Sequence, residues 1–458
     1  MGISRFLGRD GPGPAAIFSV LAGALTLGLA ITQSAASGWA AGFAIKEQSA
    51  TSQGNSFAGV SAGGEDISAM AFNPASIALY PGTRATLSVT KIDPDTKVSN
   101  ARGRTAGGAE TTGPADAGGV ADDAIVPAFY ASWQAEDSLF LAIAATAPFG
   151  LSSEYPDAWQ GRYHATESKL RSFEAAPTLA WRPLPQLALG AGLRIQYFDA
   201  KLKNAIDTSS LAGVAFNPAN DSDFELEGDD WALGYSFGAV FLPSPTTRLG
   251  LAYRSRIDHK LDGEADFTRS ALGDVVNEQT QVKGKGLLAD SAASAKITTP
   301  DSLSLGFVQE LGPAWSVMGE AAWTGWSSFE TLRVRFENPD QPDSVTEQDW
   351  DDSWFLSLGS SYRPSENWVL RAGVAYDQSP VPDDTRNPRI PDADRYWVSL
   401  GATWQLDHWL ELNAGYSHIF MSDSKTDLTL SDNQTGGALS ADYESDIDIF
   451  AISLSLKF

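Results

Sequence analysis

The sequence predicts an all-β protein, a 14-stranded antiparallel transmembrane β-barrel plugged by an N-terminal hatch, and three observations predict it. The 458 residues include 22 Phe, 14 Trp, 12 Tyr and 42 Gly, but after the first segment every apolar run is soon interrupted by charge, Gly or Pro. Large apolar side chains alternate with small or polar ones, as they do in outer-membrane strands. Short polar turns alternate with long acidic connections, which is typical of exported barrels.

The composition excludes several classes of function. The formal net charge of -25 argues against nucleic acid, because phosphate binding needs a basic face. Cysteine is absent, which excludes a disulfide framework, a thiolate metal site and a thiol nucleophile. The four histidines lack zinc-site spacing, and no nucleophile motif stands near His408 or His418. We therefore expect no metal, no cofactor and no enzymatic activity.

Residues 1–40 predict a cleaved signal peptide. Arg5 and Arg9 precede an apolar run over 15–31, and small residues lead to Ala40, after which we place the cleavage. The run is shorter than the roughly 20 residues that a membrane-spanning helix needs. An uncleaved anchor helix is the alternative. The segment predicts export, and together with the strands it predicts the bacterial outer membrane.

Residues 41–82 predict a hatch inside the barrel. They are rich in Gly, Ser and Ala, yet they also carry Ile67, Met70, Phe72 and Ile77, which a loose periplasmic tail would not need. A 14-stranded barrel is too wide for its own wall side chains to fill. We therefore prefer a plug to a tail.

Residues 83–458 predict the barrel wall. Segments 231–241, 368–377 and 450–458 alternate large apolar residues with Gly, Ala, Ser or charged residues, and the first alternating segment begins at Thr83. Short turns are expected near 135–138, 182–186, 242–246, 311–314, 363–367 and 406–409. Long connections are expected near 96–124, 149–167, 207–226, 269–285, 337–349, 378–394 and 422–442. Six short and seven long connections give 14 strands, with both barrel ends in the periplasm.

Short motifs in a fixed order resemble the FadL/TodX-type outer-membrane transporters for long-chain fatty acids and other hydrocarbons. The resemblance covers nearly all of the chain after residue 40. The matching stretches are 41–43 (AGF), 73–75 (NPA), 92–95 (IDPD), 148–151 (PFGL), 161–165 (GRYHA), 253–255 (YRS), 323–327 (WTGWS), 377–382 (DQSPVP), 390–397 (IPDADRYW) and the terminal Phe458. Each motif is weak alone, but their order and spacing make a chance match improbable.

The resemblance implies a monomeric, hatch-gated barrel for passive uptake of hydrophobic molecules. The ligand is expected to land on an outer groove, to move to an inner pocket beside the hatch, and to leave sideways through a kink in the third strand. By the same match, Phe43 would lie at the inner pocket, although simple plug packing is the alternative. Asn73, Pro74 and Ala75 would form the hatch switch. An Asn that bonds its own backbone and a Pro that fixes φ also predict a tight turn there.

Candidate ligand residues come from two groups. Apolar residues in the loops, which could form the outer groove or simply pack against one another, are Leu211, Val214, Phe216, Leu272, Val275 and Val276. Inward-facing arginines could bind a carboxylate through paired hydrogen bonds, and these are Arg194, Arg254, Arg371 and Arg395. Arg395, together with Trp397 in the matched run, is the strongest candidate. The alternative is a lumenal ion-pair network with Asp377, Asp394 and Glu411, since buried charges are normally paired.

The lateral gap is expected in segment 139–150. Pro148 cannot donate a backbone N–H and Gly150 weakens pairing, but Pro148 could instead only end the strand as it enters an outer loop. The kink could lie lower, at Ala145 and Ala147 among other alanines. The exit route therefore rests on the resemblance.

Other partners and functions remain open at this level. The acidic outer loops could share divalent cations with lipopolysaccharide phosphates, although solvated charge is the simpler explanation. Outer-membrane lipids and, through Phe458, the barrel-assembly machinery are further expected partners. A general diffusion porin and a barrel phospholipase are the competing functions. Whether the substrate is a fatty acid, an alkane or an aromatic hydrocarbon is not decided.

Overall fold

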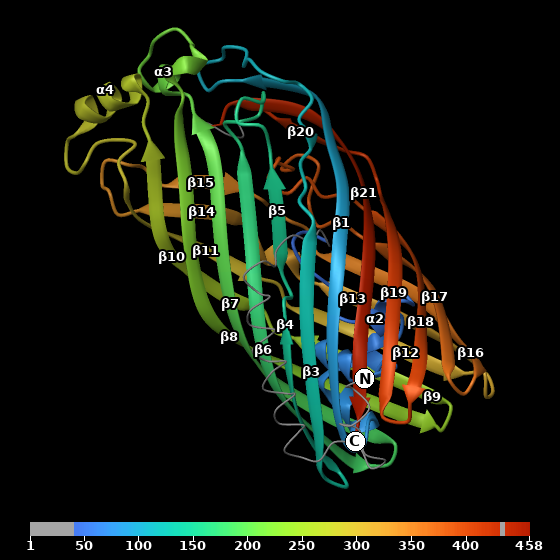
Figure 1. Cartoon of the computed structure of the whole chain (residues 1–458). Helices are drawn as coiled ribbons and strands as arrows, with labels where there is room; N and C mark the ends of the chain where they lie inside the picture. Colours follow the sequence, from blue (N-terminus) through green and yellow to red (C-terminus); the bar gives the residue numbers. More distant parts are fainter. Residues whose placement is uncertain (1–40, 431–435) are drawn as a thin grey trace, which may run out of the picture.

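The computed structural model describes residues 41–430 and 436–458, so the predicted signal peptide lies outside the described residues. The strands form one closed antiparallel sheet, which is the barrel wall. The chain runs along this wall 14 times from one end to the other, and each passage is called a crossing. This confirms the predicted 14-stranded barrel. The first crossing, β1 (Thr83–Arg104), pairs with the last, β21 (Ala438–Lys457), from Arg84↔Lys457 to Arg104↔Ala438. Figure 1 shows the tall barrel, with the long strands rising to a cap of loops at one end.

The remaining elements follow the chain around the wall. Three crossings are built from two successive strands each, namely β4 with β5, β9 with β10, and β11 with β12. The wall strands between β1 and β21 are β3 (Ala124–Glu136), β4 (Leu139–Thr146), β5 (Gly150–Glu154), β6 (Glu167–Leu184), β7 (Leu187–Ile206), β8 (Ser222–Ser244), β9 (Thr247–Arg254), β10 (Ile257–Thr268), β11 (Ser291–Thr299), β12 (Ser302–Glu310), β13 (Trp315–Thr324), β16 (Ser353–Ser365), β17 (Trp368–Asp377), β18 (Arg395–Asp407) and β19 (Leu410–Met421). The loop elements are β2 (Gly118–Gly119), α3 (Thr208–Leu211), η5 (Pro218–Asn220), α4 (Ala271–Thr280), η6 (Trp326–Ser328), β14 (Thr331–Phe336), β15 (Ser344–Glu347) and β20 (Ser424–Leu428).

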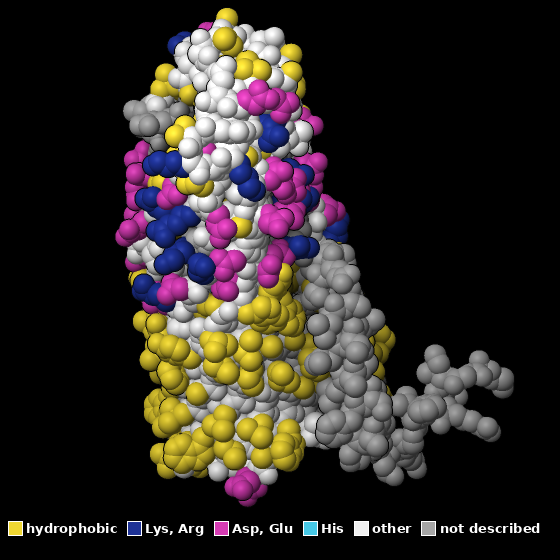
Figure 2. Space-filling model, turned by 90° about the vertical axis from the view of Figure 1, so that its left-hand side faces the viewer, with side chains coloured by type: hydrophobic (Ala, Val, Ile, Leu, Met, Phe, Trp, Pro, Cys, Tyr) yellow, Lys and Arg dark blue, Asp and Glu magenta, His cyan; other side chains and the backbone are white. Residues whose placement is uncertain are grey.

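The predicted alternation holds in the lower part of the wall. Trp231, Leu233 and Phe237 point outward with exposed fractions of 60%, 66% and 53%, whereas the intervening Ser236 is 7% exposed. Figure 2 shows such outward side chains as a broad apolar band around the lower half of the visible face. A band of this kind faces lipid, because each strand alternates lipid-facing and lumen-facing residues.

All six predicted short turns separate strands in the structure, but several strands extend farther into the long connections than predicted. β1 continues to Arg104, and β8 begins at Ser222. Above the apolar band the outward positions carry charge, as in the pair between Lys201 and Glu225. The strands remain paired in this region although large apolar and small residues no longer alternate. The alternating sequence pattern therefore ends before the strand ends, which is why these strands were predicted too short.

The hatch segment, residues 41–82, lies inside the lower barrel (Figure 1, blue). Its helices are α2 (Ala50–Gln53), η2 (Val60–Ala62), η3 (Ile67–Ala71) and η4 (Pro74–Leu79), and they contact strands around the wall. Ile67, Met70 and Ile77 are at most 5% exposed, as a plug requires. Small wall residues make room for it, because a Cβ at Gly190 would meet the backbone of residues 74–75 at 2.3–2.7 Å.

No helix in the described part of the chain has the length and apolar character needed to cross a bilayer.

Candidate functional site

An apolar cavity of ≈ 710 Å³ lies in the barrel lumen above the hatch. Its lining is dominated by inward-facing aliphatic side chains from β5, β6, β7, β8, β10 and β11, which include Leu151, Leu170, Leu202, Leu226, Leu261 and Ile297. Phe43 of the hatch also lines it, and the polar lining residues are Ser168, Glu227, Ser294, Gln348, Asn387 and Arg389. The Glu227 carboxylate pairs with Lys201. We call this space the inner cavity. Its mainly aliphatic lining suits an apolar chain, since each CH₂ transferred from water to apolar surroundings gains about 0.8 kcal/mol.

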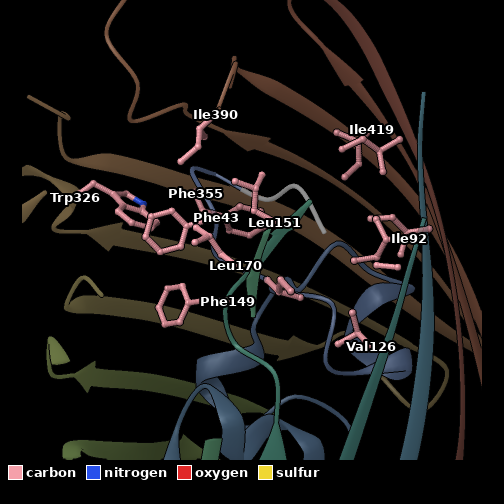
Figure 3. Close-up of a cluster of buried hydrophobic side chains, with 14 of the residues drawn as sticks. Phe43, Ile92, Val126, Phe149, Leu151, Leu170, Trp326, Phe355, Ile390 and Ile419 are labelled. Carbon is pink, nitrogen blue, oxygen red and sulfur yellow. The ribbon is translucent and has the colours of Figure 1, made fainter. Parts of the chain in front are cut away.

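Phe43 sits at the centre of an aromatic cluster and is completely buried. Its ring centroid lies 4.8 Å from that of Trp326, 5.8 Å from Trp350 and 6.0 Å from Phe329. Figure 3 shows Phe43 and Trp326 meeting beside Phe149 and Leu170. Phe43 therefore lines the inner cavity and also packs in the hydrophobic core between the hatch and the wall. Trp326 lies in the 323–327 motif, but nothing in the sequence indicates that its ring turns inward.

The third crossing of the wall is broken at residues 147–149. β4 pairs with β6 up to Thr146↔Glu174, and β5 resumes the pairing at Gly150↔Arg171. Pro148 therefore lies inside the third crossing, between β4 and β5, and does not end the crossing at an outer loop, which corrects that alternative. On the other side, β3 pairs with β4 only as far as Phe129↔Ala145. Ala145 thus marks the lower edge of the break, and Ala147 lies within it.

The hatch itself completes the ladder at this break. Ala44 forms an isolated antiparallel bridge with Phe149. The N–H of Ile45 donates to the carbonyl of Pro148 at 2.8 Å, and the N–H of Gly150 donates to the carbonyl of Phe43 at 2.9 Å. Residues 43–45 therefore act as a short strand that joins the inner cavity to the break in the third crossing.

A second cavity, ≈ 820 Å³, lies on the other side of residues 43–45, and we call it the lower cavity. The hatch residues Lys46 and Phe72 line it together with Pro148 and Phe149 at the break. The wall contributes Arg194, Arg254, Glu320 and Phe355 to the lining of this cavity.

An outer cavity of ≈ 1510 Å³ lies under the long loops at the capped end of the barrel. Leu211, Phe224, Phe267, Leu288 and Phe336 line it, and it shares Asn387 and Arg389 with the inner cavity. The two spaces therefore meet at these two side chains.

Of the loop residues predicted for an outer groove, Leu211 lines this cavity. Phe216 and Val275 do not, since Val275 is 44% exposed on α4 and Phe216 is half-buried in the preceding loop. Val276, at 4% exposure, packs inside the loop layer as the alternative expected.

None of the four predicted arginines lines the inner cavity, and each forms an ion pair with a lumenal or hatch carboxylate. Arg395 is fully buried and pairs with Asp377 (3.4 Å) and Asp392. Arg371 pairs with the hatch residue Glu65. Trp397 is 1% exposed and packs edge-on against Phe57 and Phe355, and it does not reach the inner cavity.

The lumenal arginines form ion pairs, as the alternative interpretation expected, but only one of the three expected carboxylates pairs with an arginine. Asp377 pairs with Arg395 as expected, whereas Asp394 accepts from the Tyr376 hydroxyl and Glu411 pairs with Lys457. Arg194 and Arg254 share Glu174 at 2.8 and 3.1 Å. The acidic partners Glu65, Glu174 and Asp392 were missed, because lumenal neighbours depend on how the strands and the hatch meet in space.

Arg389 was also missed, although it lies where the outer and inner cavities meet. Its guanidinium donates to the carbonyl of Glu167, the hydroxyl of Ser168 and the side-chain oxygen of Asn204, all neutral acceptors at 3.0–3.3 Å. Within residues 41–430 and 436–458 no carboxylate pairs with it. Burial lowers the pKa of Arg389 to about 10, so it remains charged at neutral pH.

The Asn73-Pro74-Ala75 stretch forms the predicted turn. The Asn73 side-chain oxygen accepts from the N–H of Ala75 at 2.9 Å, and its amide donates to the carbonyls of Ser61 (2.5 Å) and Ala239 (3.2 Å). The side chain therefore caps η4 and links two parts of the hatch to β8. The same three residues recur at 217–219, where Asn217 caps η5 in an exposed loop.

Comparison with known proteins places the chain among outer-membrane proteins. A family model described as outer membrane protein transport protein (OMPP1/FadL/TodX) matches residues 30–458. A long-chain fatty acid transport protein of Escherichia coli O6:H1 is 26% identical over 96% of this chain and 99% of its own length. Outer membrane protein P1 of Haemophilus influenzae is 27% identical over 83% and 86%.

Solved structures agree with the fold. The crystal structure of a Pseudomonas aeruginosa FadL homologue has a TM-score of 0.84 and 28% identity, and covers 91% of this chain and 100% of its own. The Pseudomonas putida toluene transporter TodX has a TM-score of 0.66 at 17% identity, with 91% and 99% covered, which shows a shared fold.

Proposed function

The chain belongs to the OMPP1/FadL/TodX family of outer membrane transport proteins, and from that premise we propose that it takes up long-chain amphiphiles, fatty acids first among them, by passive diffusion. The molecule enters the outer cavity, passes Arg389 into the inner cavity, and leaves sideways at the break in the third crossing. Phe43 is the floor of the inner cavity, and residues 43–45 are the gate.

One observation carries this proposal: the hatch strand 43–45 lines the inner cavity on one side and completes the broken wall strand on the other. A ligand that displaces Phe43 must therefore move the residues that bond to Pro148 and Gly150. Only two hydrogen bonds join residues 43–45 to the break, and each contributes about 1 kcal/mol net. That contribution is small against the burial of a long alkyl chain at about 0.8 kcal/mol per CH₂.

The charge distribution favours a tail with an anionic head. The inner cavity has aliphatic walls and a cation without a carboxylate partner, Arg389, where it meets the outer cavity. A carboxylate would accept charge-assisted hydrogen bonds there while its tail fills the aliphatic space. The fatty-acid names of several relatives agree with this choice.

Leu211 and its apolar neighbours form the landing surface for the tail, and the tight turn at Asn73, Pro74 and Ala75 is the fixed point against which the hatch moves. We propose further that the chain works as a monomer, that its signal peptide is removed after Ala40, that Phe458 is read by the barrel-assembly machinery, and that the charged outer wall contacts lipopolysaccharide.

The proposal is tested by uptake of labelled oleate into cells that lack other fatty-acid transporters and produce this chain. We expect uptake to depend on the chain and to saturate. Planar-bilayer conductance distinguishes a general porin, since a barrel closed by its hatch should be nearly silent. Steady large conductance without oleate uptake would contradict the proposal.

A further inference from the structure

Lys46 is a cation on the hatch without an acidic partner. Its ammonium lies 4.6 Å from the ring centroid of Phe355, a cation–π contact, and it is half-buried at the lower cavity. No carboxylate within the described residues forms an ion pair with it. An ammonium held by an aromatic face alone remains able to bind an anion, because cation–π contacts are weaker than a hydrogen-bonded ion pair.

The other charges of the lower cavity leave an excess of positive charge. Arg194 and Arg254 line it and share the single carboxylate of Glu174. The Glu320 carboxylate is occupied by the N–H and hydroxyl of Ser61, at 3.2 and 2.5 Å. Glu174 is therefore shared by the two arginines and Glu320 is bonded to Ser61, which leaves no carboxylate of this cavity for Lys46.

The lower cavity also has an apolar side, formed by Ile45, Phe57, Phe72, Pro148, Phe149 and Phe355. Pro148 and Phe149 belong to the break in the wall. A carboxylate near Lys46 could thus extend its tail toward that break.

We propose that the lower cavity is a second binding site for the carboxylate of an amphiphile, with Lys46 as the specificity-determining residue and Arg254 beside it. This inference rests on the proposed function and adds a site beyond the inner cavity. The head moves from Arg389, above Phe43, to Lys46, below it, while the tail reaches the opening. Lys46 directly follows Ile45, whose N–H bonds to Pro148, so a carboxylate bound at Lys46 acts next to the strand that closes the wall.

The test compares uptake of oleate with uptake of oleyl alcohol, which has the same tail and no charge. The variants are Lys46→Met, which keeps the length and the packing on Phe355, Lys46→Arg, which keeps the charge, and Lys46→Gln in case the first does not assemble. Lys97→Met is the matched control, since Lys97 is exposed outside and pairs with Asp95 at 2.7 Å. Heat-modifiable migration in gels confirms that each barrel is assembled.

We expect Lys46→Met to lower oleate uptake about tenfold or more, to leave oleyl alcohol uptake within about twofold, and to leave oleate binding at the inner cavity, read by tryptophan fluorescence, unchanged. Lys46→Arg should restore most of the oleate uptake. Equal loss for acid and alcohol, or equal oleate uptake by Lys46→Met and Lys97→Met, would overturn the inference while the proposed function stands. Failure of the unmodified chain to take up either molecule would instead overturn the proposed function, and the inference with it.

Discussion

The backbone N–H of Gly42 donates to the carboxylate of Asp392 at 2.8 Å, across 350 positions of sequence. Asp392 belongs to the long connection 378–394 and is itself paired with Arg395. Burial raises the pKa of Asp392, and the Arg395 guanidinium opposes that rise. The beginning of the hatch is thus tied to an outer loop, one residue before Phe43 and the strand that completes the wall.

A disulfide between hatch and wall should stop uptake reversibly. Ala44 and Phe149 form a bridge flanked by the two hydrogen bonds of residues 43–45, so their Cα atoms fall in the range that a disulfide spans. The chain has no other cysteine. We expect Ala44→Cys with Phe149→Cys to block oleate uptake when oxidised and to recover its reduced-state rate with dithiothreitol. The single Ala44→Cys variant should not respond to reductant, and equal uptake in both redox states would show that the gate lies elsewhere.

Replacing Phe43 with Ala should weaken ligand binding and loosen the hatch. The ring is fully buried among five aromatic partners, so its loss should destabilise hatch docking by about 3 kcal/mol or more. We expect at least tenfold weaker oleate binding, read by quenching of tryptophan fluorescence. Phe237→Ala, on the lipid-facing surface at 53% exposure, is the control and should bind normally. Normal binding by Phe43→Ala would remove Phe43 from the site.

The two Asn-Pro-Ala turns allow a matched comparison. Asn73 caps its turn and also bonds Ser61 and Ala239, whereas Asn217 caps an exposed turn. We expect Asn73→Ala to destabilise the docked hatch by about 1–3 kcal/mol and to lower uptake, because the cap and the hydrogen bonds to Ser61 and Ala239 are lost. Limited proteolysis of residues 41–82 measures the docking. Asn217→Ala should change neither quantity, and an equal effect of both would refute a special role for residues 73–75.

Deletion of 73–75 should abolish uptake while the barrel still assembles.

A methyl group at Gly238 should push the hatch away from the wall. A Cβ there would lie 1.8 Å from the Asn73 side-chain oxygen, closer than any contact allows. Because the wall strand is held by pairs on both sides, the hatch must move. We expect Gly238→Ala to raise single-channel conductance in planar bilayers. Gly119→Ala, where a Cβ meets nothing within 4 Å, should leave the conductance unchanged. Silent channels from Gly238→Ala would mean that the hatch adapts without opening.

Docking of the hatch should weaken as pH rises. Burial raises the pKa of Glu47 from 4.5 to about 7, with Lys46 and Arg395 opposing the rise and Asp377 adding to it. Between pH 4.5 and 7 the Glu47 carboxyl is protonated in the docked hatch but ionised in the undocked one. The contribution of this group to docking is therefore complete below about pH 4.5, and the free energy of docking weakens by about 3 kcal/mol by pH 7. Hydrogen exchange of residues 43–50 measures this after correction for intrinsic rates. Glu47→Gln should reduce the slope, whereas the exposed Glu110→Gln should keep it. An unchanged slope in Glu47→Gln would assign the pH dependence to another group.

The chain's own pattern was enough to predict the barrel. Strand alternation repeats every two residues, so segments such as 231–241 and 450–458 reveal an outward apolar face and an inward small-residue face without any knowledge of their neighbours. The six tight turns follow from Pro, Gly and polar residues between such segments. The hatch follows from apolar side chains, such as Ile67 and Ile77, in a segment without alternation. All of these signals are local.

The site depends on contacts between distant parts of the chain. Nothing near Phe43 indicates that it meets Trp326 and Trp350, and nothing near Pro148 indicates that the strand resumes at Gly150 with the hatch bonded across the break. The register of the closed sheet and the path of the hatch inside it determine which lumenal side chains face each other. For that reason Arg395 is bound to Asp392 in the folded protein, while Arg389 and Lys46, which no motif marks, are left facing the cavities.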